Sequence, residues 1–142
     1  MSFFLFTVGV IYANMIEYSI HRYLFHGLGK KKNSMFAFHL RGHHLISRKN
    51  NFIDLKISIF ETIGVLFLMG TQLPIYFMAP PIFYGVVTYG VLFIILHNYM
   101  HKNSEFAERY FWWHWKHHMQ NQNKSWGVVL PLTDIITNTL EK

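Results

Sequence analysis

Long apolar runs separated by short polar segments dominate the hydrophobic pattern of this chain. Ser2 to Ile20 carries a single charged residue, Glu17, and the 40 residues from Thr62 to His101 carry no Asp, Glu, Lys or Arg. A helix needs about 20 residues to cross the hydrocarbon core of a bilayer. The pattern therefore predicts three membrane spans, at about 2–20, 57–78 and 82–100.

The second and third spans form a predicted helical hairpin. Its turn is expected at Ala79, Pro80 and Pro81, because proline favours turns and the first turn of a helix. Pro74 either kinks the first arm or forms the turn itself, and the pattern leaves both possibilities open. The polar segments 21–56 and 101–142 are expected to be helices at the membrane surface. The fold class predicted for residues 1–142 is thus a single all-α integral membrane bundle.

Composition and charge support this prediction. Only 14% of the 142 residues are charged, against about 25% in soluble domains. The net charge of +6 comes from Lys and Arg in 22–56 and 102–142, and this distribution places both segments on the cytoplasmic face. The charge is therefore a sign of membrane topology rather than of nucleic-acid binding. The chain has no cysteine, which excludes thiolate metal sites and disulfides.

The chemistry of the chain is concentrated in ten histidines that form four clusters. The spacings are H-x4-H, H-x3-H-H, H-x3-H and H-x2-H-H, and the residues are His21 and His26; His39, His43 and His44; His97 and His101; and His114, His117 and His118. Residues three or four apart share one face of an α-helix. His39 therefore aligns with His43 while His44 is about 100° away and free for a second metal, and His21 and His26 do not share a face.

Imidazole is the commonest metal ligand in proteins, and ten of them exceed what one ion can bind. We expect two ions with four or five histidines each. Two carboxylates are candidates for orienting the ligands. Glu17 precedes His21 by four residues, and either it orients that ring or it faces the lipid headgroups. Asp134 either plays a similar role or is the N-terminal charge of a last helix.

Four sequence segments resemble the fatty acid hydroxylase/sterol desaturase superfamily, with the greatest likeness to its fatty acid 2-hydroxylase branch. In chain order they read EYSIHRYLFHG, HLRGHH, HNYMH and HWKHHMQNQNKSWGVVLPLTD. The resemblance implies a membrane enzyme of the endoplasmic reticulum or the bacterial inner membrane, with all ten histidines as metal ligands. It implies two metal ions, nominally iron, and O2 as co-substrate. It also implies an external electron donor, either a haem b-type carrier or a ferredoxin/reductase.

The reaction implied by this resemblance is hydroxylation of a lipid C–H bond in a fatty acyl, sphingolipid or sterol substrate. Carotenoid ring hydroxylases have similar histidine clusters, and a lipid desaturase would use the same metal chemistry. A protein of another class, a non-catalytic metal-binding or metal-transporting membrane protein, would need polar residues along its spans. The hairpin offers only Thr62, Thr71, Gln72 and Thr88 as polar non-aromatic residues before His97.

Overall fold

Three long helical rods carry the apolar runs in the computed structural model, which describes residues 2–56 and 59–142. The first rod is α1 followed without a break by the π-helix η1 and the short 3-10 helix η2. α3 and α4 form the second rod, and α5 the third. Their bounds are Phe3–Ser19 for α1, Ile20–Gly27 for η1, Leu28–Lys30 for η2, Ile59–Thr71 for α3, Leu73–Met78 for α4 and Pro80–Met100 for α5.

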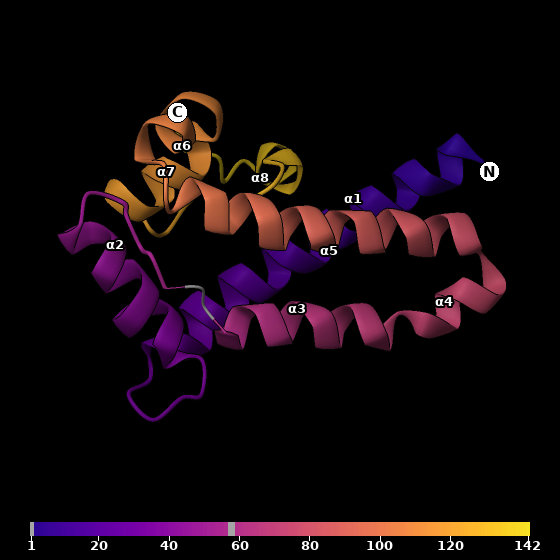
Figure 1. The fold of residues 1–142 in the computed structure, drawn as a ribbon, viewed down its shortest axis with the longest axis horizontal. Helices are drawn as coiled ribbons and strands as arrows, with labels where there is room; N and C mark the ends of the chain where they lie inside the picture. Colours follow the sequence, from indigo (N-terminus) through magenta and orange to yellow (C-terminus); the bar gives the residue numbers. More distant parts are fainter. Residues whose placement is uncertain (1, 57–58) are drawn as a thin grey trace.

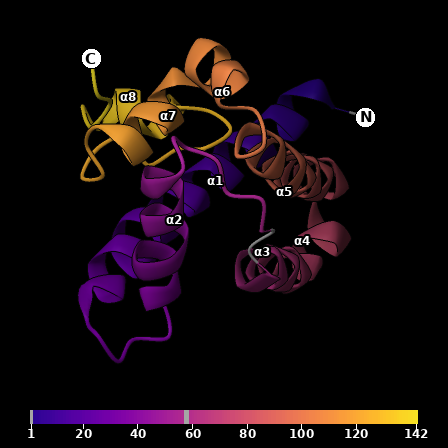
Figure 2. The same cartoon turned by 60° about the vertical axis from the view of Figure 1, so that its left-hand side comes forward.

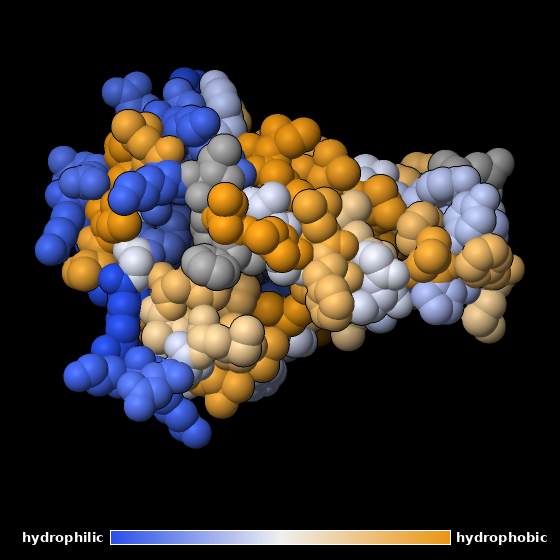
Figure 3. Space-filling model, turned by 60° about the horizontal axis from the view of Figure 1, so that its bottom comes forward, coloured by the Kyte–Doolittle hydropathy of each residue, from blue (hydrophilic) through white to orange (hydrophobic). Residues whose placement is uncertain are grey.

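The rods have the length and polarity of membrane spans. Among the described residues, three stretches are long and apolar enough to cross a membrane: Phe3–Lys30, Glu61–Met78 and Pro80–Met100. Large apolar side chains point outward from them, including Phe67 at 70% and Ile95 at 58% exposure. Hydrophobic residues cover most of the visible surface, whereas hydrophilic residues gather at one end (Figure 3). This all-helical architecture indicates membrane association, as the hydropathy pattern predicts.

α1 and α5 cross closely because glycines lie at their contact. α3 and α5 run side by side, and α1 crosses on the other side of α5 (Figures 1 and 2). A Cβ atom on Gly9 would lie 2.2 Å from the carbonyl oxygen of Ile82, and one on Gly85 would lie 2.3 Å from that of Phe6. Any side chain at either position would push the two backbones apart. Glycine therefore sets the distance between these helices.

The hairpin turns at a single residue, Ala79, which is non-helical between α4 and α5. Pro80 and Pro81 occupy the first turn of α5, where a missing N–H is harmless. Pro74 lies at the start of α4 and so breaks the first arm after Gln72 without forming the turn. The expected start of this arm at 57 and 58 lies outside the described residues.

The remaining helices gather at one end of the rods (Figure 1). They are the π-helix η3 and the helices α2, α6, α7 and α8, with bounds His39–His44, Leu45–Lys49, Ser104–Tyr110, Trp112–Met119 and Leu132–Ile136. Phe52, Met100, Ala107 and Val128 form an apolar core between them. This end of the molecule brings the four histidine clusters together.

Candidate metal centre

All ten histidines are buried, and none is more than 6% exposed. Nine of them form two groups, and within each group one ring nitrogen of every member lies within 4.8 Å of one nitrogen of every other member. The first group is His21, His26, His39, His44 and His117, and the second is His43, His97, His101 and His118. His114 adjoins the second group, with its Nε2 3.2 Å from that of His101. Two buried histidine clusters of this kind are consistent with a dimetal centre.

The histidines of the first two clusters divide between the two groups differently from the sequence-based expectation, because the helices that carry them are π-helices. Both η1 and η3 have i→i+5 hydrogen bonding, which brings residues five apart onto one face. His21 therefore lies beside His26, and His39 lies beside His44. The α-helical prediction that His39 pairs with His43 is wrong in this respect. His43 turns to the second group instead.

The third and fourth clusters follow ordinary α-helical geometry. The histidines of the fourth cluster divide between the two groups. His97 and His101, four residues apart at the end of α5, both join the second group. His117 and His118 are neighbours on α7, and a rotation of about 100° separates them. His117 consequently enters the first group and His118 the second. Spacings of three and four along an α-helix predict that His114, His117 and His118 aim at one point, but the fold divides His117 from His118.

Hydrogen bonds at Nδ1 fix the protonation of three rings in the first group. His21 Nδ1 donates to the Trp126 carbonyl at 2.6 Å, His117 Nδ1 donates to the Lys124 carbonyl at 2.6 Å, and His39 Nδ1 donates to Glu61 Oε1 at 2.7 Å. Carbonyl and carboxylate oxygens only accept, so each Nδ1 carries the proton. In a neutral imidazole the Nε2 atom then presents a lone pair.

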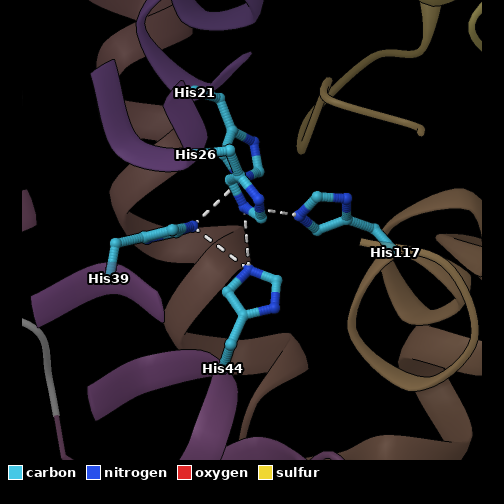
Figure 4. Close-up of side chains that lie close together, drawn as sticks. All are labelled: His21, His26, His39, His44 and His117. Carbon is cyan, nitrogen blue, oxygen red and sulfur yellow. Dashed lines mark hydrogen bonds between the residues drawn. The ribbon is translucent and has the colours of Figure 1, made fainter. Parts of the chain in front are cut away.

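These lone pairs face one another (Figure 4). His39 Nε2 lies 3.1 Å from His21 Nε2 and 3.2 Å from His44 Nε2. His26 Nε2 lies 3.1 Å from His44 Nε2 and 3.2 Å from His117 Nε2. Two nitrogens bound to one ion at about 2.1 Å would lie about 3.0–3.4 Å apart for ligand angles between a right angle and the tetrahedral angle. The nitrogens of the first group thus have the spacing that a shared cation requires, and His21, His39 and His117 also have the required protonation.

The second group is oriented in the same way. His43 Nδ1 donates to Asp54 Oδ2 at 3.0 Å, and His101 Nδ1 donates to the Phe52 carbonyl at 2.9 Å. His97 Nδ1 lies 3.5 Å from Glu61 Oε2. Among the described residues, His43 Nε2 and both nitrogens of His118 have no hydrogen-bond partner despite full burial. Buried polar atoms without partners are costly, and a second cation would satisfy His43 Nε2 and one nitrogen of His118.

Burial keeps six of these imidazoles neutral. It lowers the pKa of His39, His44, His114, His117 and His118 well below 6.5. Burial, together with the nearby His43, lowers the pKa of His101 to about 3. A metal ligand must be unprotonated. The rings are therefore ready to bind cations at neutral pH, and imidazole donors suit iron, zinc, copper and nickel alike.

Glu61 is the carboxylate that joins the two groups, because its two oxygens lie next to His39 of one and His97 of the other. Sequence reasoning missed both Glu61 and Asp54. An acid directly before a 40-residue uncharged span was a usable signal for Glu61. The backbone carbonyls that orient three of the rings leave no trace in a sequence.

The two carboxylates singled out from the sequence have other contacts. Glu17 is hydrogen bonded to the Tyr89 hydroxyl and to the Val128 N–H, while His21 Nδ1 bonds to a backbone carbonyl. Asp134 lies in the first turn of α8, and its oxygens accept from the N–H groups of Trp126 and Gly127. Asp134 therefore shapes the turn whose carbonyls orient His21 and His117.

An apolar cavity of about 610 Å³ ends at the histidines. α1, α3 and α5 line it, and its walls include Ile20, Leu68 and Phe93. His21 and His39 of the first group and His97 of the second also line it, as does Glu61. The cavity therefore connects an apolar space between the rods to both histidine groups.

The chain belongs to the fatty acid hydroxylase family, whose model matches residues 6–139. This confirms the resemblance read from the histidine segments. No solved structure matches the chain significantly.

Several curated proteins are distant relatives. Fatty acid 2-hydroxylase of Mus musculus is 27% identical over 161 residues, and ceramide very long chain fatty acid hydroxylase SCS7 of Saccharomyces cerevisiae is 30% identical over 146 residues. Dihydroceramide fatty acyl 2-hydroxylase FAH2 of Arabidopsis thaliana is 27% identical over 143 residues. The matches cover 96%, 96% and 93% of this chain. They cover only 39%, 38% and 58% of the respective relatives.

Proposed function

We propose that this protein is a membrane-bound, O2-dependent dimetal hydroxylase, with non-haem iron, that acts on a lipid C–H bond. The observation that carries the proposal is the meeting of two groups of buried imidazoles with an apolar cavity. All ten histidines serve as ligands in this proposal, with His114 completing the second group. The names of the relatives favour a fatty acyl or sphingolipid substrate over a sterol or carotenoid.

The residues of the chain have three roles in this reaction. The carbonyls of Trp126, Lys124 and Phe52 hold the rings in one tautomer, and Glu61 ties the two groups together. The apolar walls exclude water and bind the lipid chain. Iron, when bound, supplies the O2 activation that side chains cannot. One oxygen atom enters the C–H bond and the other leaves as water, with two electrons from a donor and two protons from solvent.

The electron donor proposed is a separate protein, a haem b-type carrier or a ferredoxin with its reductase. We further propose that residues 1–142 form one hydroxylase-like membrane unit in the endoplasmic reticulum or a bacterial inner membrane. The basic segments 22–56 and 102–142 would face the cytoplasm, by the positive-inside rule. The histidine-bearing end would then meet a cytoplasmic electron donor.

Lipid profiling tests the proposal. Cells expressing the protein should accumulate lipids heavier by one oxygen atom, and cells expressing His117→Ala should not. Lys116→Ala, at the neighbouring position of α7, is the matched control and should retain the product. Lipids lighter by two hydrogen atoms would indicate a desaturase instead. Purified, iron-loaded protein that consumes no O2 with any lipid and donor would favour a non-catalytic metal-binding protein.

A further inference from the structure

The lining of the cavity includes residues from Glu61 of α3, beside the histidines, to Gln72 directly after α3, which takes part in a polar contact. Glu61 and Gln72 of its lining are eleven residues apart, which corresponds to about 16 Å at 1.5 Å per helical residue. At the Gln72 end, the Tyr12 hydroxyl of α1 donates to Gln72 Oε1 at 3.0 Å. Gln72 Nε2 in turn donates to the Thr71 hydroxyl at 2.9 Å.

This contact links the two rods that border the cavity. Ala13, next to Tyr12 on α1, lines the cavity together with Gln72 and with Val86 of α5. An apolar chain that extended past Gln72 toward α1 would meet this hydrogen bond, whose Tyr12 side chain is 39% exposed beside the lining residue Ala13. If the bond broke, the Tyr12 hydroxyl and Gln72 Oε1 would lose a partner in apolar surroundings, which is unfavourable. Gln72 Nε2 would keep its bond to Thr71.

We propose that the Tyr12–Gln72 pair is a chain-length stop, and that cavity depth selects which acyl chains this protein accepts. The inference rests on the proposed function in taking a lipid chain as the occupant. The pair makes Tyr12 and Gln72 specificity-determining residues that lie far from the histidines. Chains that fit between the histidines and the pair bind well, and longer chains bind less well.

Two glycines of α3 offer a matched test of cavity depth. A Cβ on Gly64 or on Gly70 would meet no heavy atom within 4 Å. Gly64 lines the cavity, whereas Gly70 is not among its lining residues. A leucine at position 64 therefore enters the cavity near the histidine end, while one at position 70 does not.

The experiment measures the affinity of purified full-length protein for a series of straight-chain saturated fatty acids that differ by two carbons. Displacement of an environment-sensitive fluorescent fatty acid provides the readout, with or without bound metal. Affinity should rise about tenfold per added pair of methylenes up to a limiting length and then fall. Tyr12→Phe, which removes only the hydroxyl, and Gln72→Ala should both move the limit to longer chains.

Control variants distinguish a change in the chain-length stop from a general change in the fold. Tyr76→Phe removes the hydroxyl of a tyrosine on α4 that is about as exposed as Tyr12 but packs against Phe77 and Phe83, and it should leave the limit in place. Gly64→Leu should move it to shorter chains, and Gly70→Leu should not. The inference is overturned if affinity rises with length without a limit, if no chain binds, or if Tyr12→Phe and Gln72→Ala leave the limit unchanged in correctly folded protein.

The two proposals fail in different ways. If the limit moves as expected but no O2 is consumed, the chain-length stop stands and the hydroxylase proposal falls. If hydroxylated lipid forms but its chain-length distribution is the same in Tyr12→Phe, Gln72→Ala and Gly64→Leu, the stop falls and the hydroxylase stands.

Discussion

Individual hydrogen bonds determine which nitrogen of each histidine faces the candidate metal centre. The acceptors at Nδ1 come from distant parts of the chain, and one of them lies on a strained residue. Phe52 has a φ of 76°, a conformation that bulky residues rarely adopt. Its ring stacks on His101, 4.3 Å away, while its carbonyl accepts from the same histidine. The strained backbone of Phe52 therefore lies where its carbonyl orients the ring of His101.

Glu61→Gln should weaken metal binding in both histidine groups, because Glu61 contacts His39 and His97. An amide offers one acceptor oxygen where the carboxylate offers two. Loss of a ligand-orienting carboxylate typically costs about 10–100-fold in metal affinity. Metal content after dialysis against graded chelator buffers checks this expectation.

Asp54→Asn is the matched control, because Asp54 contacts His43 of the second group. It should lower the occupancy of one ion and leave the other in place. A Glu61→Gln protein that loses no more metal than Asp54→Asn would contradict the bridging role of Glu61.

The two π-helices are the elements that sort histidines between the groups. A π-helix accommodates one residue more per turn than an α-helix, so residues five apart share a face. In η3 this places His39 and His44 in one group and leaves His43 for the other. The π-helical register of η3 therefore decides which of the two groups each of its three histidines joins.

Inserting an alanine after Gly42 should disrupt binding of both metals, because it places His44 six residues after His39, a spacing that shares a face in neither an α-helix nor a π-helix. The insertion also moves His43 away from the second group. Gly42→Ala preserves the register, and a Cβ there would meet nothing within 4 Å. That variant should bind two ions and gain about 0.5–1 kcal/mol of stability. Metal per chain by mass spectrometry distinguishes the two variants, and an insertion variant that still binds two ions would argue against the π-helical sorting.

Gly85→Ala should destabilise the protein through the crossing of α1 and α5. Its new Cβ would lie 2.3 Å from a backbone oxygen that cannot move alone. Overpacking of this kind costs about 1–3 kcal/mol, so the thermal midpoint in detergent should fall. Gly70→Ala, in open space on α3, should leave the midpoint unchanged or raise it. Equal midpoints for the two variants would show that the crossing tolerates a larger separation.

At the scale of the whole molecule, one end of a three-rod apolar body buries ten imidazoles (Figures 1 and 3). Burial, together with the charge of neighbouring rings, lowers the pKa of His39, His44, His101, His114, His117 and His118. The folded state consequently binds fewer protons than the unfolded state whenever free histidine is protonated. Metal-free protein should therefore be sensitive to acid.

The stability of metal-free protein should fall as the pH drops below about 6.5, the ordinary histidine pKa. For His101, whose folded pKa is about 3, the loss continues down to that pH. Each histidine with a lowered pKa contributes a slope of about 1.4 kcal/mol per pH unit in this range. Thermal midpoints of the detergent-solubilised, metal-free protein, measured across this pH range, test whether stability falls on acidification. A midpoint that stays constant or rises on acidification would contradict it.

The sequence alone determined the all-helical membrane architecture, the four histidine clusters and their family, because hydropathy and side-chain chemistry are local properties. Tertiary structure decided how the clusters divide, since π-helical hydrogen bonding changes which residues share a face. It also decided the partners of the rings. Glu61, Asp54 and three backbone carbonyls reach the histidines only after distant segments pack together. Such contacts depend on the packed backbone, and no residue pattern specifies them.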